Sequence, residues 1–217
     1  MNRVLILGAG GHGHVVADIL VQAGAAGASV QVLGFLDDDP QIQGAATLSV
    51  PILGTLSALG TIPHDSVILA IGDNRRRQQL FAQLSTRGEQ FVIARHPTAV
   101  IAPDVEIGPG TMICAGVIVN PGSIIGANVI LNTGCTVDHH NRIGNHVHIA
   151  PGSHLGGAVE IGEGTLIGIG AIVLPQRQIG SWTILGAGAL SNRDLGDHVV
   201  AVGMPAHIIR SQPTQEE

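Results

Sequence analysis

Residues 143–173 read IGNHVHIAPGSHLGGAVEIGEGTLIGIGAIV, and an aliphatic residue opens every group of six. The same spacing holds at fifteen consecutive positions from Ile101 to Leu185. The probability that fifteen fixed positions agree by chance is negligible, because only about a quarter of residues in ordinary chains are Ile, Leu or Val. A helix repeats every 3.6 residues and a strand every two, whereas a hexapeptide β-solenoid repeats every six. The stretch therefore predicts a β-solenoid.

A second register runs four residues after each aliphatic position. It holds small or β-branched residues, and Asn141 and Arg177 are the exceptions. The chain has 31 glycines, no tyrosine and 2% aromatic residues. Because few large rings are available to fill a globular core, stacked aliphatic layers are the expected interior.

Composition excludes several function classes. The chain has no lysine, which excludes a lysine Schiff base and a Walker-type phosphate lysine. A net charge of −6, with no basic run longer than Arg75–Arg77, argues against nucleic acid as a partner. Two cysteines, Cys114 and Cys135, are too few for a disulfide framework, so we expect a reducing cytoplasm. No stretch of 18 uncharged apolar residues predicts a membrane span.

Residues 1–97 differ from the solenoid and form a predicted Rossmann-like domain. Strands are expected at 3–7, 30–36, 67–71 and 90–94, with helices at 14–23 and 75–86. This alternation predicts a small parallel α/β sheet. We expect the solenoid domain to occupy 98–210, after a hinge at His96-Pro97, and a polar tail to occupy 211–217.

The loop Gly8-x-Gly10-x-x-Gly13 follows a predicted strand and opens a predicted helix, and Asp37 follows some two dozen residues on. This is the context in which backbone N–H groups bind phosphate. The alternative is a tight turn that uses glycine only for its backbone freedom. A dehydrogenase is disfavoured, because about 95 residues supply one mononucleotide half only. A nucleotide diphosphate fits better.

Five of the eleven histidines fall within 16 residues: His139, His140, His146, His148 and His154. We expect His146 and His154 to be solvated surface residues. A zinc site needs three converging imidazoles. The competing interpretation is general-base catalysis, for which a neutral imidazole is suited during acyl transfer.

The segment Thr136–Gly144, TVDHHNRIG, resembles the bacterial sugar acyltransferases of the sialic acid O-acetyltransferase and UDP-bacillosamine or GDP-perosamine N-acetyltransferase type. Further matches span nearly the whole chain, at Gly8–Gly13, Leu36–Asp38, Ala70–Asn74, Arg77, Asn132-Thr133, His148, Gly157 and Val202–Ala206. The resemblance implies a left-handed parallel β-helix of triangular section with three hexads per coil. It also implies a homotrimer that binds acetyl-CoA between adjacent solenoids and holds the substrate against the neighbouring N-terminal domain.

The resemblance also implies residue roles. His139 would be the general base that deprotonates the acceptor, His148 would contact the acyl donor or transition state, and Asn132 would support them. Backbone amides near Gly157 and Ile169, with His148, would meet acetyl-CoA. The implied nucleotide-sugar contacts are Gly10, Gly11, His12, Asp37, Asp38, Asn74 and Arg77. No metal is expected.

One residue departs from the family pattern. The family usually has an acid directly after the catalytic histidine, and this chain has His140. Asp138 precedes His139, but neighbouring strand residues point to opposite faces. We therefore expect either another carboxylate or a backbone carbonyl to orient His139.

The expected function is acetyl-CoA-dependent N-acetylation of a nucleotide-linked amino sugar, of the 4-amino-4,6-dideoxy type, by direct transfer. Three alternatives remain open. They are O-acetylation of sialic acid or a related sugar, a zinc-dependent hydratase, and a non-catalytic nucleotide-binding trimer.

Overall fold

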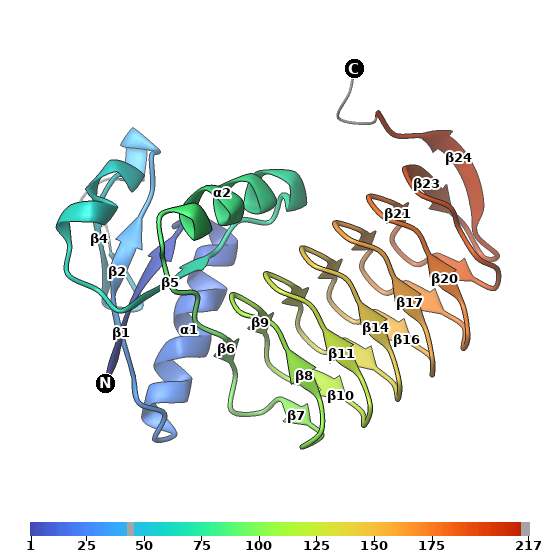
Figure 1. Ribbon diagram of the computed structural model, residues 1–217, viewed down its shortest axis with the longest axis horizontal. Helices are drawn as coiled ribbons and strands as arrows, with labels where there is room; N and C mark the ends of the chain where they lie inside the picture. Colours follow the sequence, from blue (N-terminus) through green and yellow to red (C-terminus); the bar gives the residue numbers. More distant parts are fainter. Residues whose placement is uncertain (43–45, 214–217) are drawn as a thin grey trace. The chain divides into compact units, whose positions relative to one another are not determined.

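The computed structural model describes residues 1–42 and 46–213. The chain divides into two compact units, Met1–Pro97 and Thr98–Glu217 (Figure 1). Within the described residues, no helix is long and apolar enough to cross a membrane.

The described part of the first unit is built on a sheet with the strand order β3-β4-β2-β1-β5. The strands are β1 (Asn2–Leu7), β2 (Val30–Leu36), β3 (Ala46–Thr47), β4 (Val50–Gly54) and β5 (Ser66–Leu69), followed later by β6 (Ala94–Arg95). The helices are α1 (Gly11–Ala25), α2 (Asn74–Thr86) and two short 3-10 helices, η1 (Pro40–Ile42) and η2 (Leu56–Thr61). β1 pairs in parallel with β2 on one side and with β5 on the other, so the order in which strands are added to the sheet reverses at β1. In such sheets ligands bind outside the carboxyl ends of the strands at this switch point.

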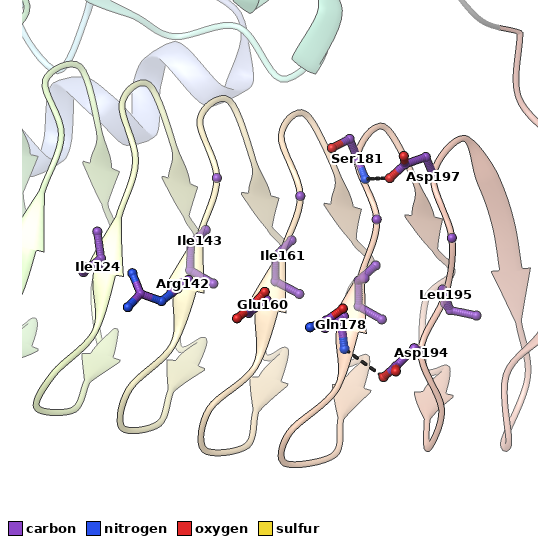
Figure 2. A pocket seen from close by; sticks show the side chains of 15 residues that line it. Ile124, Arg142, Ile143, Glu160, Ile161, Gln178, Ser181, Asp194, Leu195 and Asp197 are labelled. Carbon is purple, nitrogen blue, oxygen red and sulfur yellow. Dashed lines mark hydrogen bonds between the residues drawn. The ribbon is translucent and has the colours of Figure 1, made fainter.

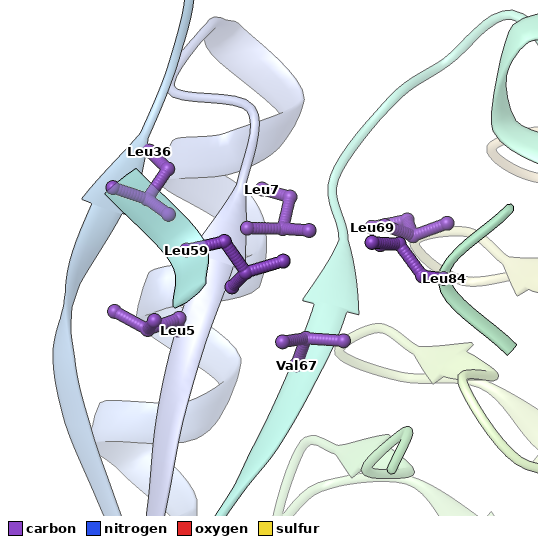
Figure 3. Packing of buried hydrophobic residues seen from close by; sticks show 7 residues of the cluster. All are labelled: Leu5, Leu7, Leu36, Leu59, Val67, Leu69 and Leu84. Carbon is purple, nitrogen blue, oxygen red and sulfur yellow. The ribbon is translucent and has the colours of Figure 1, made fainter. Parts of the chain in front are cut away.

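Six leucines and one valine from several elements form a buried cluster on one side of this sheet (Figure 3). The cluster comprises Leu5, Leu7, Leu36, Leu59, Val67, Leu69 and Leu84. Each such side chain contributes about 1.5–3 kcal/mol when it is fully buried. Leu7, Leu36 and Leu69 are the last residues of their strands, so the core fixes the strand ends from which the loops of the site begin.

The first unit differs from the sequence expectation in two places. Strand β4 and helix η2 were not predicted, although β4 lies parallel to β2. The strand expected at 90–94 is reduced to a single bridge between Phe91 and Val67, followed by β6. β4 carries Pro51 and η2 contains Gly60, so local propensity gave no strong signal there.

The second unit is a left-handed parallel β-helix with three sheets. Sheet I contains β7 (Val100–Ile101), β10 (Ile118–Val119), β13 (Thr136–Val137), β16 (His154–Leu155), β19 (Ile172–Val173) and β22 (Leu190–Ser191). Sheet II contains β8 (Glu106–Ile107), β11 (Ile124–Ile125), β14 (Arg142–Ile143), β17 (Glu160–Ile161) and β20 (Gln178–Ile179). Sheet III contains β9 (Met112–Ile113), β12 (Ile130–Leu131), β15 (His148–Ile149), β18 (Leu166–Ile167), β21 (Ile184–Leu185), β23 (Val199–Val202) and β24 (His207–Ser211).

Each coil pairs with the next at a spacing of eighteen residues, as Ile118 does with Thr136. Three hexads therefore make one coil, as expected. We name the turns between sheets the I–II corner (138–141 in one coil), the II–III corner (144–147) and the III–I corner (150–153). The aliphatic register is the second residue of each strand, and it is buried from Ile113 onwards.

The second register also faces the interior, where its hydroxyl groups bind backbone carbonyls. The Ser153 hydroxyl donates to Gly168 O (2.7 Å) and the Thr183 hydroxyl to Gly196 O (2.7 Å). The exception Asn141 is fully buried in the same register, and its Nδ2 donates to Gly156 O (2.9 Å). Asn141 thus follows the same interior hydrogen-bonding rule as its hydroxyl-bearing neighbours.

The periodicity ends at Ser191, and the chain closes with an antiparallel pair, β23 and β24. Ser211, in the segment predicted as a polar tail, pairs with Val199. Gln212 donates its backbone N–H to His198 O and its Nε2 to Trp182 O. The described order therefore continues past residue 210, and residues 214–217 lie outside the described residues.

Candidate active site

The glycine loop divides into two structural and two open glycines. Gly8 has φ +110°, and a Cβ there would lie 2.8 Å from Ala70 O. A Cβ on Gly13 would overlap the Gly8 carbonyl oxygen. A Cβ on Gly10 or Gly11 would meet nothing within 4 Å, and no side chain caps α1 at Gly10. The first two glycines make the tight turn, and the other two leave the helix N-terminus open to a ligand.

A cavity of about 180 Å³ opens at the carboxyl ends of β1, β2 and β5. Its lining comprises Leu7, Gly8, Gly10, Leu36, Asp37, Asp38, Leu56, Ala70, Ile71 and Arg76. Asp37 Oδ2 accepts from Ala9 N (2.7 Å), which fixes the glycine loop to the end of β2. Asp38 Oδ1 accepts from Leu56 N (2.9 Å). The structure thus brings the predicted residues Gly10, Asp37 and Asp38 into one cavity at the switch point.

Arg77, a predicted substrate contact, is not among the described residues that line this cavity. Its side chain is fully buried, and Nη1 donates to Ile71 O (3.0 Å). Burial lowers the pKa of Arg77 to about 10. Arg76, which the sequence argument left out, is exposed and lines the cavity. Arg77 therefore supports the loop after β5, and Arg76 is the cation at the cavity.

The other predicted contacts of this unit lie around the same loops. Asn74 is the first residue of α2, and Asp73 caps that helix by accepting from Arg76 N (2.8 Å). His12 lies in the first turn of α1 and is half-buried. Burial and the nearby charge of Arg77 lower the pKa of His12 to about 4, so His12 is neutral at pH 7.

In the solenoid, His139 is exposed at the I–II corner, and its ring lies over the next coil. A Cβ on Gly157 would be 2.6 Å from both Cε1 and Nε2 of His139. The absence of a side chain at Gly157 is what allows the imidazole to lie there. The structure thus joins the predicted base to a predicted acetyl-CoA contact.

The ring of His139 has an unexpected partner. Its Nδ1 lies 3.0 Å from Nδ1 of His140, and the two rings meet edge to face at 81°. Asp138 Oδ1 instead accepts from the backbone N–H of His139 and from Asn120 Nδ2, both at 2.8 Å. The Asn120 bond, more than any other contact, lowers the pKa of Asp138. The expected carboxylate or carbonyl partner of the ring is therefore replaced by an imidazole.

A second group of predicted residues lies at the III–I corner and on sheet III. Asn132 Nδ2 lies 3.1 Å from Nε2 of His148, and Asn132 Oδ1 accepts from Thr133 N (2.8 Å). Ile169, two coils further on at the same corner, is 61% exposed. Asn132 and His148 are in contact, Ile169 lies further along the same corner, and His139 with Gly157 lies at a different corner of the same solenoid.

His146 corrects the expectation of a solvated residue. It is buried at the II–III corner, and its Nδ1 lies 2.8 Å from Nδ2 of Asn128, its counterpart one coil earlier. The spacing of eighteen residues was the signal that would have paired them. His154 is exposed as expected, with its Nδ1 2.8 Å from the Thr136 hydroxyl.

The cysteines lie inside the solenoid. Cys114 and Cys135 are fully buried. Burial raises the pKa of Cys114 to about 12 and also raises that of Cys135. Neither thiol is a nucleophile in this state, because the thiolate is the reactive form. Among residues 1–42 and 46–213, no group of three His, Cys, Asp or Glu side chains is arranged to hold a metal ion.

A larger hollow, of about 680 Å³, lies along the outer surface of sheet II (Figure 2). Polar side chains such as Arg142, Glu160 and Gln178 project into it from successive strands. Asp194 and Asp197 accept from the backbone of Gln178 (3.0 Å) and Ser181. None of the predicted site residues is among the described residues that line it, so size alone does not mark the site.

Comparison with known proteins identifies relatives that share this architecture. A family profile described as the PglD N-terminal domain matches residues 3–84. The structure of PerB from Caulobacter crescentus in complex with CoA and GDP-perosamine is 41% identical, covers 97% of this chain and 98% of its own, and superposes with a TM-score of 0.89. The acetyltransferase domain of PglB from Neisseria gonorrhoeae in complex with acetyl coenzyme A is 35% identical, covers 96% and 99% of the two chains, and also has a TM-score of 0.89.

The UDP-N-acetylbacillosamine N-acetyltransferase of Bacillus subtilis is 36% identical over 115 residues. That match spans about half of each protein, 52% of this chain and 51% of the relative. The fold and its matches define a solenoid acyltransferase preceded by an α/β domain of the PglD N-terminal type. Within that class, the chain belongs to the family of bacterial sugar acyltransferases.

Proposed function

We propose that the chain is an acetyl-CoA-dependent N-acetyltransferase whose acceptor is a nucleotide-linked 4-amino-4,6-dideoxy sugar. The observation that carries the proposal is the 41% identity, over both units, to a protein whose structure holds CoA and GDP-perosamine. The cavity with Gly10, Asp37, Asp38 and Arg76 supports it with an open helix N-terminus and a cation for the diphosphate.

His139 is the general base of the proposed reaction. The amine nitrogen attacks the thioester carbonyl carbon, and Nε2 of His139 takes the proton that the nitrogen loses. The tetrahedral intermediate then collapses, the C–S bond breaks, and the proton passes from His139 to the departing sulfur of CoA. Transfer is direct because the thiols of Cys114 and Cys135 are buried and protonated.

The active enzyme in this proposal is a homotrimer. One solenoid carries the predicted residues at two different corners, His139 and Gly157 at the I–II corner and Asn132 and Ile169 at the III–I corner. Sheet I lies between these corners along the coil. When copies pack through sheet I, the I–II corner of one copy approaches the III–I corner of its neighbour, and acetyl-CoA contacts both groups.

The outer surface of sheet I has the composition that such packing needs. Its outward positions are Val100, Ile118, Thr136, His154, Ile172 and Leu190, whereas those of sheet II are Glu106, Ile124, Arg142, Glu160 and Gln178. Val100 is 63% and Ile118 40% exposed in one copy. Burial of an apolar stripe is favourable, whereas burial of the charged face of sheet II is costly.

The activity is tested by supplying acetyl-CoA with UDP-, GDP- and dTDP-linked amino sugars and measuring free CoA. We expect turnover on at least one of them and a loss of about 100-fold or more in kcat with His139→Asn. Turnover on free sialic acid alone would replace the proposal with O-acetylation. Unchanged kcat in His139→Asn would remove the general-base role.

The trimer is tested with a matched pair of variants. Ile118→Asp places a charge on sheet I, and Ile124→Asp places the same charge at the equivalent position of sheet II. We expect light scattering after gel filtration to show a trimer for the wild type and Ile124→Asp, and a smaller, inactive species for Ile118→Asp. A trimer in both variants, both active, would contradict packing through sheet I.

A further inference from the structure

The I–II corner holds two imidazoles in a defined mutual geometry. The Nδ1 atoms of His139 and His140 are 3.0 Å apart. At that distance one nitrogen carries the proton and donates, and the other accepts with its lone pair. Two protonated Nδ1 atoms would oppose their hydrogens, and two bare ones would oppose their lone pairs.

The role of His139 decides which nitrogen is the donor. A general base that takes a proton at Nε2 must have that nitrogen bare, and a neutral imidazole then carries its proton on Nδ1. His139 is therefore the donor and His140 the acceptor. His140 in turn carries its own proton on Nε2.

We propose that His140 is the positioning residue of His139, whose Nδ1–H it accepts at its own bare Nδ1, and that this bond holds His139 in the tautomer with a bare Nε2. The proposal rests on the proposed function, because it assumes that His139 is the base. His140 touches neither substrate in this account and acts only through His139.

The fold holds His140 in place for this task. Its backbone lies in the left-handed region, with φ +59°. Its ring lies over Gly122 in the preceding coil, where a Cβ would be 2.8 Å from Cδ2 of His140. His139 leans the other way, over Gly157 in the following coil. The two rings are thus seated on opposite neighbours and meet at their Nδ1 atoms.

The carboxylate beside the pair has other hydrogen-bond partners. Asp138 Oδ1 is occupied by the His139 backbone N–H and by Asn120 Nδ2. These two bonds tie Oδ1 to the corner's backbone and to the preceding coil, and the hydrogen bond at Nδ1 of His139 is made with His140. The acceptor of the Nδ1–H is therefore a neutral group.

Two substitutions separate the hydrogen bond from the packing. His140→Phe keeps a ring over Gly122 and removes the acceptor. His140→Asn keeps an acceptor, and asparagine tolerates the left-handed backbone. Gln176→Phe is the matched control, because Gln176 occupies the same corner position two coils on, with φ +63°.

We expect His140→Phe to lower kcat by about 10- to 100-fold, the usual effect of removing the partner that orients a functional histidine, with KM for both substrates unchanged. His140→Asn should restore most of the loss, and Gln176→Phe should match the wild type. A His140→Phe enzyme with wild-type kcat, or no rescue by asparagine, would overturn the proposal.

A spectroscopic measurement tests the same inference without turnover. The ring 15N shifts of His139 in the wild-type protein, assigned by their absence in His139→Asn, should show a protonated Nδ1 and a bare Nε2. His140→Phe should shift His139 toward the opposite tautomer. A wild-type His139 protonated on Nε2 would refute the assignment even where a variant folds poorly.

The outcomes distinguish this inference from the function on which it rests. If His139→Asn leaves kcat unchanged, the general-base proposal fails and the positioning role fails with it. If His139→Asn abolishes activity while His140→Phe leaves kcat and the His139 tautomer unchanged, only the positioning role fails.

Discussion

Gly157→Ala tests whether the position of the His139 ring over Gly157 determines kcat. The new Cβ would lie 2.6 Å from Cε1 and Nε2 of His139, whereas ordinary contacts begin at 3.4 Å. The ring must therefore move by the difference, 0.8 Å. Because Gly157 does not have a positive φ, alanine adds no backbone strain.

A displacement of about 1 Å of a catalytic group can cost about 100-fold in rate. We therefore expect kcat of Gly157→Ala to fall by about that factor, measured as CoA release at saturating substrates. The His139 ring is exposed, and an outward shift breaks only its contact with His140, so the free energy of unfolding should change by about 1 kcal/mol or less.

Gly196→Ala is the control for the glycine substitution itself. Gly196 also lies in the solenoid, and a Cβ there would meet nothing within 4 Å. Its kcat and melting temperature should match those of the wild type. Wild-type kcat in Gly157→Ala would refute the reasoning, and so would an equal loss in Gly196→Ala.

Three further predictions follow from polar groups that are fully or partly buried. Asn141→Val leaves the carbonyls of Asp138 and Gly156 without this donor and should lower the free energy of unfolding by about 1–3 kcal/mol in urea titrations. Asn141→Ser keeps a hydroxyl donor and should lose less stability. Equal stability of the wild type and both variants would be inconsistent with a stabilising hydrogen bond from Asn141. The pKa of His12 is lowered from 6.5 in the unfolded chain to about 4 in the folded state. Protonation therefore favours the unfolded chain, so the contribution of neutral His12 to the free energy of unfolding is fully present above pH 6.5 and is lost as the pH falls to about 4. His12→Gln should flatten that fall in thermal melts, and an unchanged slope would contradict it. Asp37→Ala frees the Ala9 N–H and should raise KM for the nucleotide sugar while leaving KM for acetyl-CoA unchanged; equal changes in both constants would argue against a cavity specific to the nucleotide sugar.

The solenoid could be predicted from sequence because each coil contacts only its neighbours. A period of six gave the strand positions, and the second register gave the interior column. Asn141 is an exception to the second register by residue type, but it follows the hydrogen-bonding pattern of that register. Its place fifteen residues before Gly156 is the spacing at which Ser153 binds Gly168, so the same rule covers it.

The first unit was less predictable because its sheet is assembled from distant segments. Strand β4 is held by β2 and has no strong local pattern. The resemblance implied Arg77 as a substrate contact, although Arg77 precedes the buried Leu84 by seven residues and therefore lies on the apolar face of α2. That spacing was the available signal for a buried arginine, and it left Arg76 as the residue at the cavity.

The partner of His139 could not be read from sequence, since the alternation of strand side chains does not apply at a corner. His140 and His146 share a left-handed backbone, with φ +59° and +60°. That conformation costs a residue with a side chain about 1–2 kcal/mol, so each histidine needs a compensating contact. His146 is buried and bonded to Asn128, a contact that ties two coils together. His140 is exposed, and its Nδ1 lies 3.0 Å from Nδ1 of the neighbouring His139. The same left-handed backbone therefore places one imidazole in a stabilising contact between coils and, in the proposed mechanism, the other beside the base that it orients.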